Sequence, residues 1–240
     1  MEVITLDKVE STNSYGKMNI DNLADRTVVR AKVQTNGRGR LNRSWVDLGE
    51  NNLFLSIILK PSDSFNEIYP NLTQYLSVVL CKVLEKYGVT PQIKWPNDVL
   101  IDGKKIAGIL SETVFEGQKL KGIVLGVGVN LNANRKAVSS IPDKLATALN
   151  LELNKDINAD KFLEKLLEEF FANYDEFLAK GFSMIKDYYL DKNCFLNKEI
   201  SVQVFNNKKT GLAKSINDNG ELVLQPKEDK ELILTIGDIL

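Results

Sequence analysis

Four short segments carry residues whose types and spacing could do chemistry. The first runs from Gln34 to Trp45 and alternates two glycines with two arginines before a third arginine. Glycine lets backbone N–H groups approach a ligand closely, arginine supplies forked donors for phosphate, and Trp45 offers a flat face for a purine. The segment indicates phosphate binding, although a solvated basic turn or an Arg-Gly patch that binds RNA would use the same residues.

The second segment, KWPNDVLIDGKKIAGIL, spans residues 94–110. Its Asn97 and Asp98 would be costly in a core unless they were paired. Lys105 begins an otherwise apolar strand, and the interior Gly108 marks a place where a ligand could approach the backbone. In the alternative interpretation, Asn97 and Asp98 close a turn and Lys105 extends to solvent. The Arg-Gly segment shortly before it shifts the balance towards a ligand site.

The other two segments are weaker when taken alone. GVGVNLN, residues 126–132, ends an apolar strand, but no third glycine or helix start follows, so it is not a dinucleotide fingerprint. Its glycines could form a flat floor under a planar ligand with Asn130 at the rim, or could pack two strands tightly. Ser11-Thr12-Asn13 is typical of a helix cap, and its hydroxyl and amide groups could also hold a small polar head group.

The composition excludes several classes of function. The 240 residues include no histidine, which rules out Ser-His-Asp triads, Cys-His pairs and HExxH zinc sites. Two cysteines make no disulfide framework and suit a reducing compartment. The formal net charge of −1 argues against a strongly cationic nucleic-acid coat protein. Because no signal-peptide pattern or membrane-length apolar run is found, we expect a cytoplasmic protein without a membrane anchor.

Alternating strands and helices are expected to position these segments. A helix is expected from the Ser-Thr-Asn segment to about residue 24, and a long loop over Thr35–Asn51. Further strands are expected at 27–34, 52–60, 106–115 and 121–131, and further helices at 66–87, 142–149 and 160–177. From Cys194 onward, short apolar strands alternate with polar turns, which predicts a small β-barrel. We therefore expect one domain over residues 1–190 and a second over 191–240.

In their order and spacing, the four segments resemble those of biotin protein ligases. Ser-Thr-Asn, Gly-Arg-Gly-Arg followed by Arg and Trp, Lys-Trp-Pro-Asn-Asp, Lys-x-x-Gly-Ile-Leu and Gly-x-Gly-x-Asn occur in that order. One departure is Leu41-Asn42, where many relatives have a basic residue and glycine. The resemblance implies an α+β fold, the class II synthetase-like biotin/lipoate ligase catalytic domain with a mixed β-sheet flanked by helices, followed by a small C-terminal SH3-like β-barrel.

The resemblance implies a two-step reaction. Biotin and ATP, accompanied by Mg²⁺, would form biotinoyl-5′-AMP and pyrophosphate, and the activated carboxyl would pass to a lysine of a biotin carboxyl carrier protein. That carrier would belong to acetyl-CoA carboxylase or another biotin-dependent carboxylase. The chain looks like the short form of the family, which starts at the catalytic domain, so no DNA binding is expected. The resemblance does not decide whether the chain forms a homodimer, and it assigns no residue to a metal.

The resemblance also implies roles for individual residues. Lys105, Arg40 and Asp98 would be catalytic: Lys105 and Arg40 would neutralise the reacting anions, and Asp98 would accept or relay the proton of the target lysine. The residues expected to bind biotin are Ser11, Thr12, Asn13, Gln34, Gly37, Arg38, Lys105, Gly108 and Gly126. Those expected to hold ATP or the adenylate are Arg40, Arg43, Trp45, Asn97, Lys105 and Asn130.

Two other functions fit parts of the same pattern. A lipoate or octanoate ligase or transferase shares the fold, but it would need a long acyl channel in place of the ring-binding polar set. An RNA-binding protein would use the Arg-Gly loop and the terminal barrel. The net charge of −1 and the single basic loop argue against RNA binding.

Overall fold

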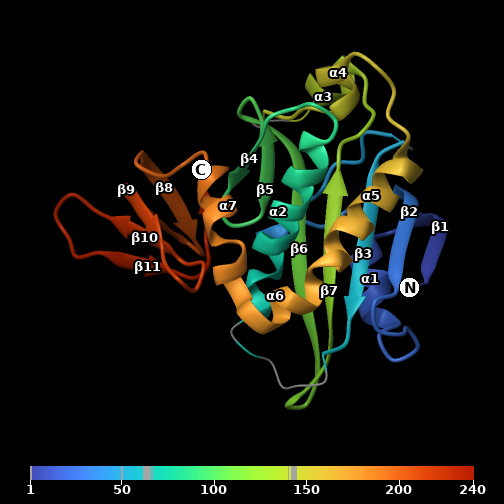
Figure 1. Ribbon diagram of the computed structural model, residues 1–240, viewed down its shortest axis with the longest axis horizontal. Helices are drawn as coiled ribbons and strands as arrows, with labels where there is room; N and C mark the ends of the chain where they lie inside the picture. Colours follow the sequence, from blue (N-terminus) through green and yellow to red (C-terminus); the bar gives the residue numbers. More distant parts are fainter. Residues whose placement is uncertain (1, 50, 62–65, 67, 140, 142–144) are drawn as a thin grey trace.

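The computed structural model describes residues 2–49, 51–61, 66, 68–139, 141 and 145–240. Its centre is a seven-stranded mixed sheet with the order β1-β2-β3-β7-β6-β5-β4 (Figure 1). β1 and β2 are parallel, and the other neighbours are antiparallel. The strands are β1 Val3–Val9, β2 Val28–Gln34, β3 Leu53–Leu59, β4 Pro91–Lys94, β5 Asp98–Ile101, β6 Lys104–Glu116 and β7 Lys119–Val129.

Helices flank this sheet, as the α+β expectation requires. They are α1 Thr12–Met18, α2 Leu72–Glu85, α3 Arg135–Ser139, α4 Leu149–Leu153, α5 Ala159–Ala172, α6 Tyr174–Lys180 and α7 Lys186–Asp191, with 3-10 turns η1 Arg40–Asn42, η2 Tyr69–Asn71 and η3 Gly181–Met184. α2 and α5 pack together across one face of the sheet, and α1 packs against β3 and β7 (Figure 1). Within the described ranges, no helix is long and apolar enough to span a membrane.

Strand β3 shows how the sheet is buried on both faces. Leu55 and Ile57 belong to the main core with residues of α2 and α5, whereas Ile58 joins a smaller core with Ile20 beside α1. Because successive side chains on a strand point to opposite faces, Ser56 lies on the same face as Ile58. We call this side of the sheet, defined by Ser56, Ile58 and α1, the α1 face.

Two helix boundaries differ from the sequence expectation for local reasons. α1 ends at Met18 rather than near residue 24, because the backbone leaves the helical conformation at Asn19 (φ −108°, ψ 14°), whose side-chain Nδ2 donates to the Tyr15 carbonyl at 2.8 Å. The single helix expected over 160–177 is two helices, α5 and α6, which meet at Asn173.

Two further helices begin later than expected. α2 begins at Leu72, after the 3-10 turn that contains Pro70, and not near residue 66. The helix expected over 142–149 falls partly outside the described residues. Its described part from 145 to 148 is not helical, and α4 begins only at Leu149.

The C-terminal strands form a second, five-stranded antiparallel sheet with the order β11-β10-β9-β8-β12. These strands are β8 Glu199–Val204, β9 Asn207–Ile216, β10 Leu222–Gln225, β11 Leu232–Leu234 and β12 Asp238–Ile239. Closure into a barrel would require its edge strands to pair. β11 and β12 are the two edges of an open sheet, so the expected barrel is not confirmed.

Polar contacts fasten the second sheet to the first. Asn71 Nδ2 donates to the Asn219 carbonyl at 2.9 Å, and Gln74 Nε2 donates to the Gly220 carbonyl at 2.8 Å. Trp95 Nε1 donates to the same Gly220 carbonyl at 3.2 Å. Since Trp95 belongs to the Lys-Trp-Pro-Asn-Asp string, the second sheet is held beside a segment that the sequence singles out for chemistry.

Candidate functional site

A cavity of about 400 Å³ opens on the α1 face of β6 and β7. Its walls come from the start of α1, the β4–β5 region, the C-terminal strand β12 and the loop after β2. This loop contains Gly37-Arg38-Gly39-Arg40, and we call it the Arg-Gly loop. Every residue expected in the site lines this cavity except Gly37. Gly37 lies in the loop just outside, where its carbonyl accepts the Trp45 backbone N–H at 2.9 Å.

Glycines of two neighbouring strands form the cavity floor. Gly108 of β6 is the register partner of Gly128 of β7, and Gly126 pairs with Leu110. A Cβ at Gly128 would lie 2.5 Å from Cε2 of the Trp45 indole, and one at Gly108 would lie 2.7 Å from its Cζ3. The indole therefore rests on the bare backbone of both strands. Its Nε1 is buried and has no hydrogen-bond partner among the described residues, so this donor is unused within the protein.

Small polar side chains at the start of α1 form one wall. Ser11 caps the helix by accepting the Ser14 backbone N–H at 3.5 Å. The Thr12 backbone N–H and hydroxyl both donate to Gln34 Oε1, at 2.8 and 3.3 Å. Ser56 Oγ lies 2.8 Å from Thr12 Oγ1. This network fixes the Gln34 amide oxygen, and with it the orientation of the whole carboxamide.

Asn13 has a more structural position than the sequence indicated. Its Nδ2 donates to the Leu110 carbonyl at 3.1 Å and to Glu112 Oε2 at 3.0 Å, and its Oδ1 lies 2.6 Å from Ser56 Oγ. Both amide hydrogens are thus used within the protein. Asn13 lines the cavity and holds α1 against β6.

Cationic side chains form the opposite wall. Lys105 Nζ lies 2.6 Å from Asp98 Oδ1 and 5.4 Å from the centroid of the Trp45 ring. Arg40 Nη1 donates to Asn97 Oδ1 at 3.3 Å. Burial lowers the pKa of Arg40, while the nearby carboxylates of Asp238 and Asp98 act to raise it. An arginine remains charged after such a shift. This wall therefore presents two cations, Lys105 and Arg40, to the cavity, each beside a carboxylate.

The expected asparagines brace the strands around the cavity. Asn97 Nδ2 donates to the Ile109 carbonyl at 2.8 Å, and Asn130 Nδ2 donates to the Thr147 carbonyl at 3.0 Å. Both residues are buried and line the cavity. Across the described part of the chain, no group of three or more Cys, Asp or Glu side chains is arranged to hold a metal ion.

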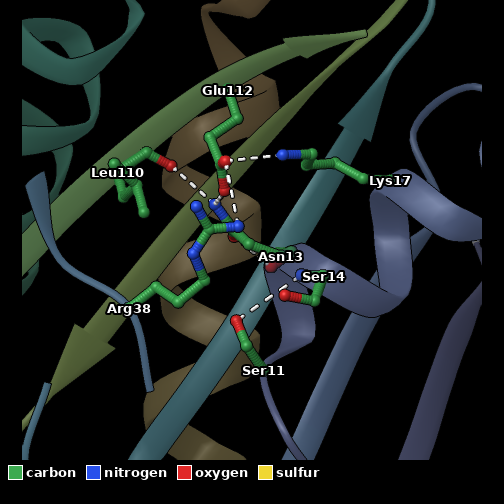
Figure 2. Close-up of polar contacts among 8 residues, drawn as sticks. Ser11, Asn13, Ser14, Lys17, Arg38, Leu110 and Glu112 are labelled. Carbon is green, nitrogen blue, oxygen red and sulfur yellow. Dashed lines mark hydrogen bonds and ion pairs between the residues drawn. The ribbon is translucent and has the colours of Figure 1, made fainter. Parts of the chain in front are cut away.

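Two acidic residues near the site were missed by the sequence reasoning. Asp238 of β12 lies 3.2 Å from Arg40 Nη1 and 2.9 Å from Arg43 Nη1. Glu112 of β6 lies 2.8 Å from Lys17 Nζ and 3.3 Å from Arg38 Nη1 (Figure 2). Neither acid stands in a motif, so only its distant cationic partners could have identified it.

The hydrogen bonds to Glu112 keep it ionised. Burial alone would raise the pKa of Glu112, but hydrogen bonds from Lys17 and Asn13 and the positive charges of Lys17 and Arg38 outweigh burial and lower it. The carboxylate is therefore charged at neutral pH and attracts both cations.

Comparison with known proteins identifies the family. The model of the biotin/lipoate A/B protein ligase family matches residues 4–130, more than half of the chain. The chain belongs to this family. The matched span contains the Ser-Thr-Asn, Arg-Gly, Lys-Trp-Pro-Asn-Asp and Gly-x-Gly-x-Asn segments that meet at the cavity.

Curated members of the biotin/lipoate protein ligase family align with most of the chain. The bifunctional ligase/repressor BirA of Bacillus subtilis is 31% identical over 212 residues, which are 87% of this chain and 64% of that relative. This chain therefore spans less than two thirds of that relative's length. The biotin–[acetyl-CoA-carboxylase] ligase of Paracoccus denitrificans is 26% identical over 242 aligned positions, 95% of this chain and 96% of the relative.

A solved structure of a biotin/lipoate protein ligase relative has the same fold. The biotin protein ligase from Aquifex aeolicus in complex with biotin and ATP is 28% identical, with a TM-score of 0.84. The match covers 100% of this chain and 97% of that one. It therefore includes the second sheet as well as the large one.

Proposed function

We propose that this chain activates biotin with MgATP to form biotinoyl-5′-AMP and pyrophosphate, and then transfers the biotinoyl group to a lysine of a biotin carboxyl carrier protein. One observation carries the proposal: a single cavity joins a wall of small polar side chains to a wall of cationic ones. Adenylation needs both, because an acid with a polar head must meet a triphosphate. The Aquifex relative, solved with biotin and ATP, supports the same pair of ligands.

The polar wall is assigned to biotin. Ser11, Thr12 and Gln34 would bind the ring, since hydroxyl and amide groups match its polar edges. Gly126 and Gly108 would line the pocket and the aliphatic tail of biotin, since their lack of a side chain lets Asn13 and Trp45 pack directly on the strands. Three further residues are assigned to the biotin end of the site: Asn13, which holds α1 in place, Gly37 and Arg38.

The cationic wall is assigned to the nucleotide. Arg40 and Arg43 would bind its phosphates, and Trp45 would stack on the purine. Asn97 and Asn130 would hold the remaining polar edges from the strand ends. Mg²⁺ would enter with the phosphates of ATP, as part of the substrate.

Catalysis in this site would be positioning and electrostatics. The biotin carboxylate oxygen attacks the α-phosphorus, pyrophosphate leaves, and two anionic groups must approach each other. Lys105 and Arg40 would neutralise both anions as charge shifts to the leaving group. In the second step the lysine amine of the carrier attacks the acyl carbon and AMP leaves. That amine, of pKa about 10.4, must lose a proton, and Asp98 would accept or relay it.

We also propose how the chain is organised. Residues 1–190 would form the catalytic domain and residues 191–240 an SH3-like domain, in a cytoplasmic protein whose partner is the carrier of acetyl-CoA carboxylase or another biotin-dependent carboxylase. The net charge of −1 supports a chain that acts without DNA. A homodimer is the assembly to test, by light scattering.

The contacts of the Arg-Gly loop favour a small ligand over RNA. Arg38 pairs with Glu112, and Arg40 and Arg43 pair with Asp238. These pairs leave the three arginines lining the cavity, where they can contact the phosphates of a small ligand, whereas a loop that bound RNA would present its arginines on an open basic surface. The RNA-binding alternative therefore lacks support.

Pyrophosphate exchange tests the proposed function directly. The purified chain, ATP and labelled pyrophosphate are incubated with biotin, with lipoate, or with neither acid. Label is expected to enter ATP in the presence of biotin, because exchange requires reversible adenylation of the acid. Exchange with lipoate and none with biotin would support the lipoate ligase alternative and overturn the proposal.

The Arg-Gly loop is expected to become ordered when the adenylate forms. Its described part, residues 35–49 and 51, contains one isolated bridge, Arg38 with Ser44, and the short turn η1. Few backbone hydrogen bonds hold such a segment, so its amides should exchange readily. Biotin plus ATP should slow hydrogen exchange there sharply, since the loop would close over the intermediate and exclude water. Equal exchange with and without ligands would contradict this prediction.

A further inference from the structure

We propose that Glu112 is a positioning residue for the biotin end of the site: its carboxylate ties the Arg-Gly loop and the start of α1 to strand β6. The inference rests on the proposed function. It concerns a residue that lies outside the cavity lining and that the sequence motifs did not single out.

Glu112 joins three separate parts of the fold (Figure 2). Its Oε1 lies 2.8 Å from Lys17 Nζ of α1 and 3.3 Å from Arg38 Nη1 of the loop. Its Oε2 accepts Asn13 Nδ2 at 3.0 Å. The Glu112 side chain is only 15% exposed, so water screens these interactions less than it screens a surface ion pair.

The place of Glu112 on β6 explains its reach. Gly108, Leu110 and Glu112 alternate along the strand and lie on the α1 face. The first two residues line the cavity, and Glu112 lies just beyond its end. A carboxylate there holds the cavity wall from behind without occupying the space of the ligand.

The ion pair between Glu112 and Arg38 fixes the position of the loop. Arg38 forms an isolated antiparallel β-bridge with Ser44. Trp45, which follows Ser44, packs on the glycines of β6 and β7. Glu112 thereby holds Arg38, which lines the cavity and is assigned to the biotin end, and through Arg38 the loop segment that leads to Trp45. At the same time it fixes which way the Asn13 carboxamide points, since Nδ2 must face the carboxylate.

Neutralising Glu112 should weaken biotin binding more than it slows the chemistry. Glu112→Gln keeps the size of the side chain but removes the charge that attracts Arg38 and Lys17. We expect the KM for biotin in pyrophosphate exchange to rise about tenfold, the loss usual for one hydrogen bond to a charged group. The kcat should stay within about twofold, because Glu112 touches no reacting atom. Hydrogen exchange of residues 35–49 should accelerate.

Glu169→Gln is the matched control. Glu169 also pairs with two cations, Lys82 and Lys86, and its side chain is 17% exposed, but it lies on α5 away from the cavity. The Glu169→Gln variant should lose as much thermal stability as Glu112→Gln does. Its KM for biotin and the hydrogen exchange of its loop should remain those of the parent chain. Glu112→Asp, which keeps the charge, should recover part of the lost affinity.

The outcomes separate this inference from the proposed function. If the parent chain shows no biotin-dependent pyrophosphate exchange, the proposed function is overturned. Faster hydrogen exchange of the loop in Glu112→Gln would in that case still support the link between β6 and the loop. An active parent chain, with unchanged KM for biotin and unchanged loop exchange in Glu112→Gln, would overturn the role of Glu112 alone. Equal changes in the KM for biotin and in hydrogen exchange of the loop in Glu112→Gln and Glu169→Gln would also overturn it, since they would indicate an effect of general destabilisation.

Discussion

Lys105→Ala is expected to reduce biotin-dependent pyrophosphate exchange by about 10²–10³-fold, the usual cost of removing one preorganised donor from a reacting anion. Lys105 lines the cavity, and its Nζ lies 2.6 Å from Asp98 Oδ1 and 5.4 Å from the centroid of the Trp45 ring. Its contacts with the reacting oxygens strengthen as charge moves during the reaction, so kcat should fall more than biotin affinity. Steady-state exchange kinetics at varied biotin measure both quantities.

Lys104→Ala is the control for that experiment. Lys104 is the preceding residue of β6 and points to the opposite side, with its side chain 46% exposed and its Nζ 4.0 Å from Glu152. Its removal should leave exchange close to that of the parent chain. An equal loss of activity in both variants, or near-parental turnover in Lys105→Ala, would show that the role given to Lys105 is wrong.

Gly126→Ala should destabilise the fold and abolish high-affinity biotin binding together. The added Cβ would lie 2.0 Å from Asn13 Oδ1, and Asn13 is held by Leu110, Glu112 and Ser56. A side chain pinned at three points moves only with α1, so we expect a loss of about 1–3 kcal/mol, as for other overpacked sites. Thermal unfolding with and without biotin measures the stability and the binding in one series.

Gly128→Ala, two residues along the same strand, provides the comparison. Its Cβ would meet the Trp45 indole, which belongs to a loop and can shift with it. We expect a smaller loss of stability than for Gly126→Ala, together with weaker ATP binding, because the indole would be lifted off the floor. If the two variants lost the same stability, Asn13 would be less rigidly held than its contacts indicate.

The motif residues that line the cavity were easier to predict from the sequence than the acidic residues, Glu112 and Asp238, that hold them in place. Gly108, Gly126 and the arginines of the loop stand in short motifs whose order along the chain is specific, and all of them line one cavity. Glu112 and Asp238 are single acids among ordinary neighbours. Their partners are distant in sequence: Lys17 and Glu112 are 95 positions apart. Such pairs form only when the tertiary fold brings them together.

Periodicity predicted the strands of the large sheet better than the ends of the helices. An apolar strand such as β3, buried on both faces, gives a clear pattern over its whole length. Where a helix stops depends on the backbone conformation of single residues, such as Asn19, whose φ of −108° and ψ of 14° end α1. The C-terminal strands were likewise visible as short apolar runs, but whether a sheet closes depends on pairing between distant edges, and β11 and β12 remain apart.

The cavity wall ends in β12, and this has a consequence for the synthesis of the protein. Asp238 and Ile239 line the cavity, and every other residue of the lining precedes them by many positions. On the ribosome, the wall is therefore incomplete until residues 238 and 239 have been added. A ligand stabilises only the folded form that binds it. A ligand that uses the whole wall would therefore stabilise the fold only after β12 has been added.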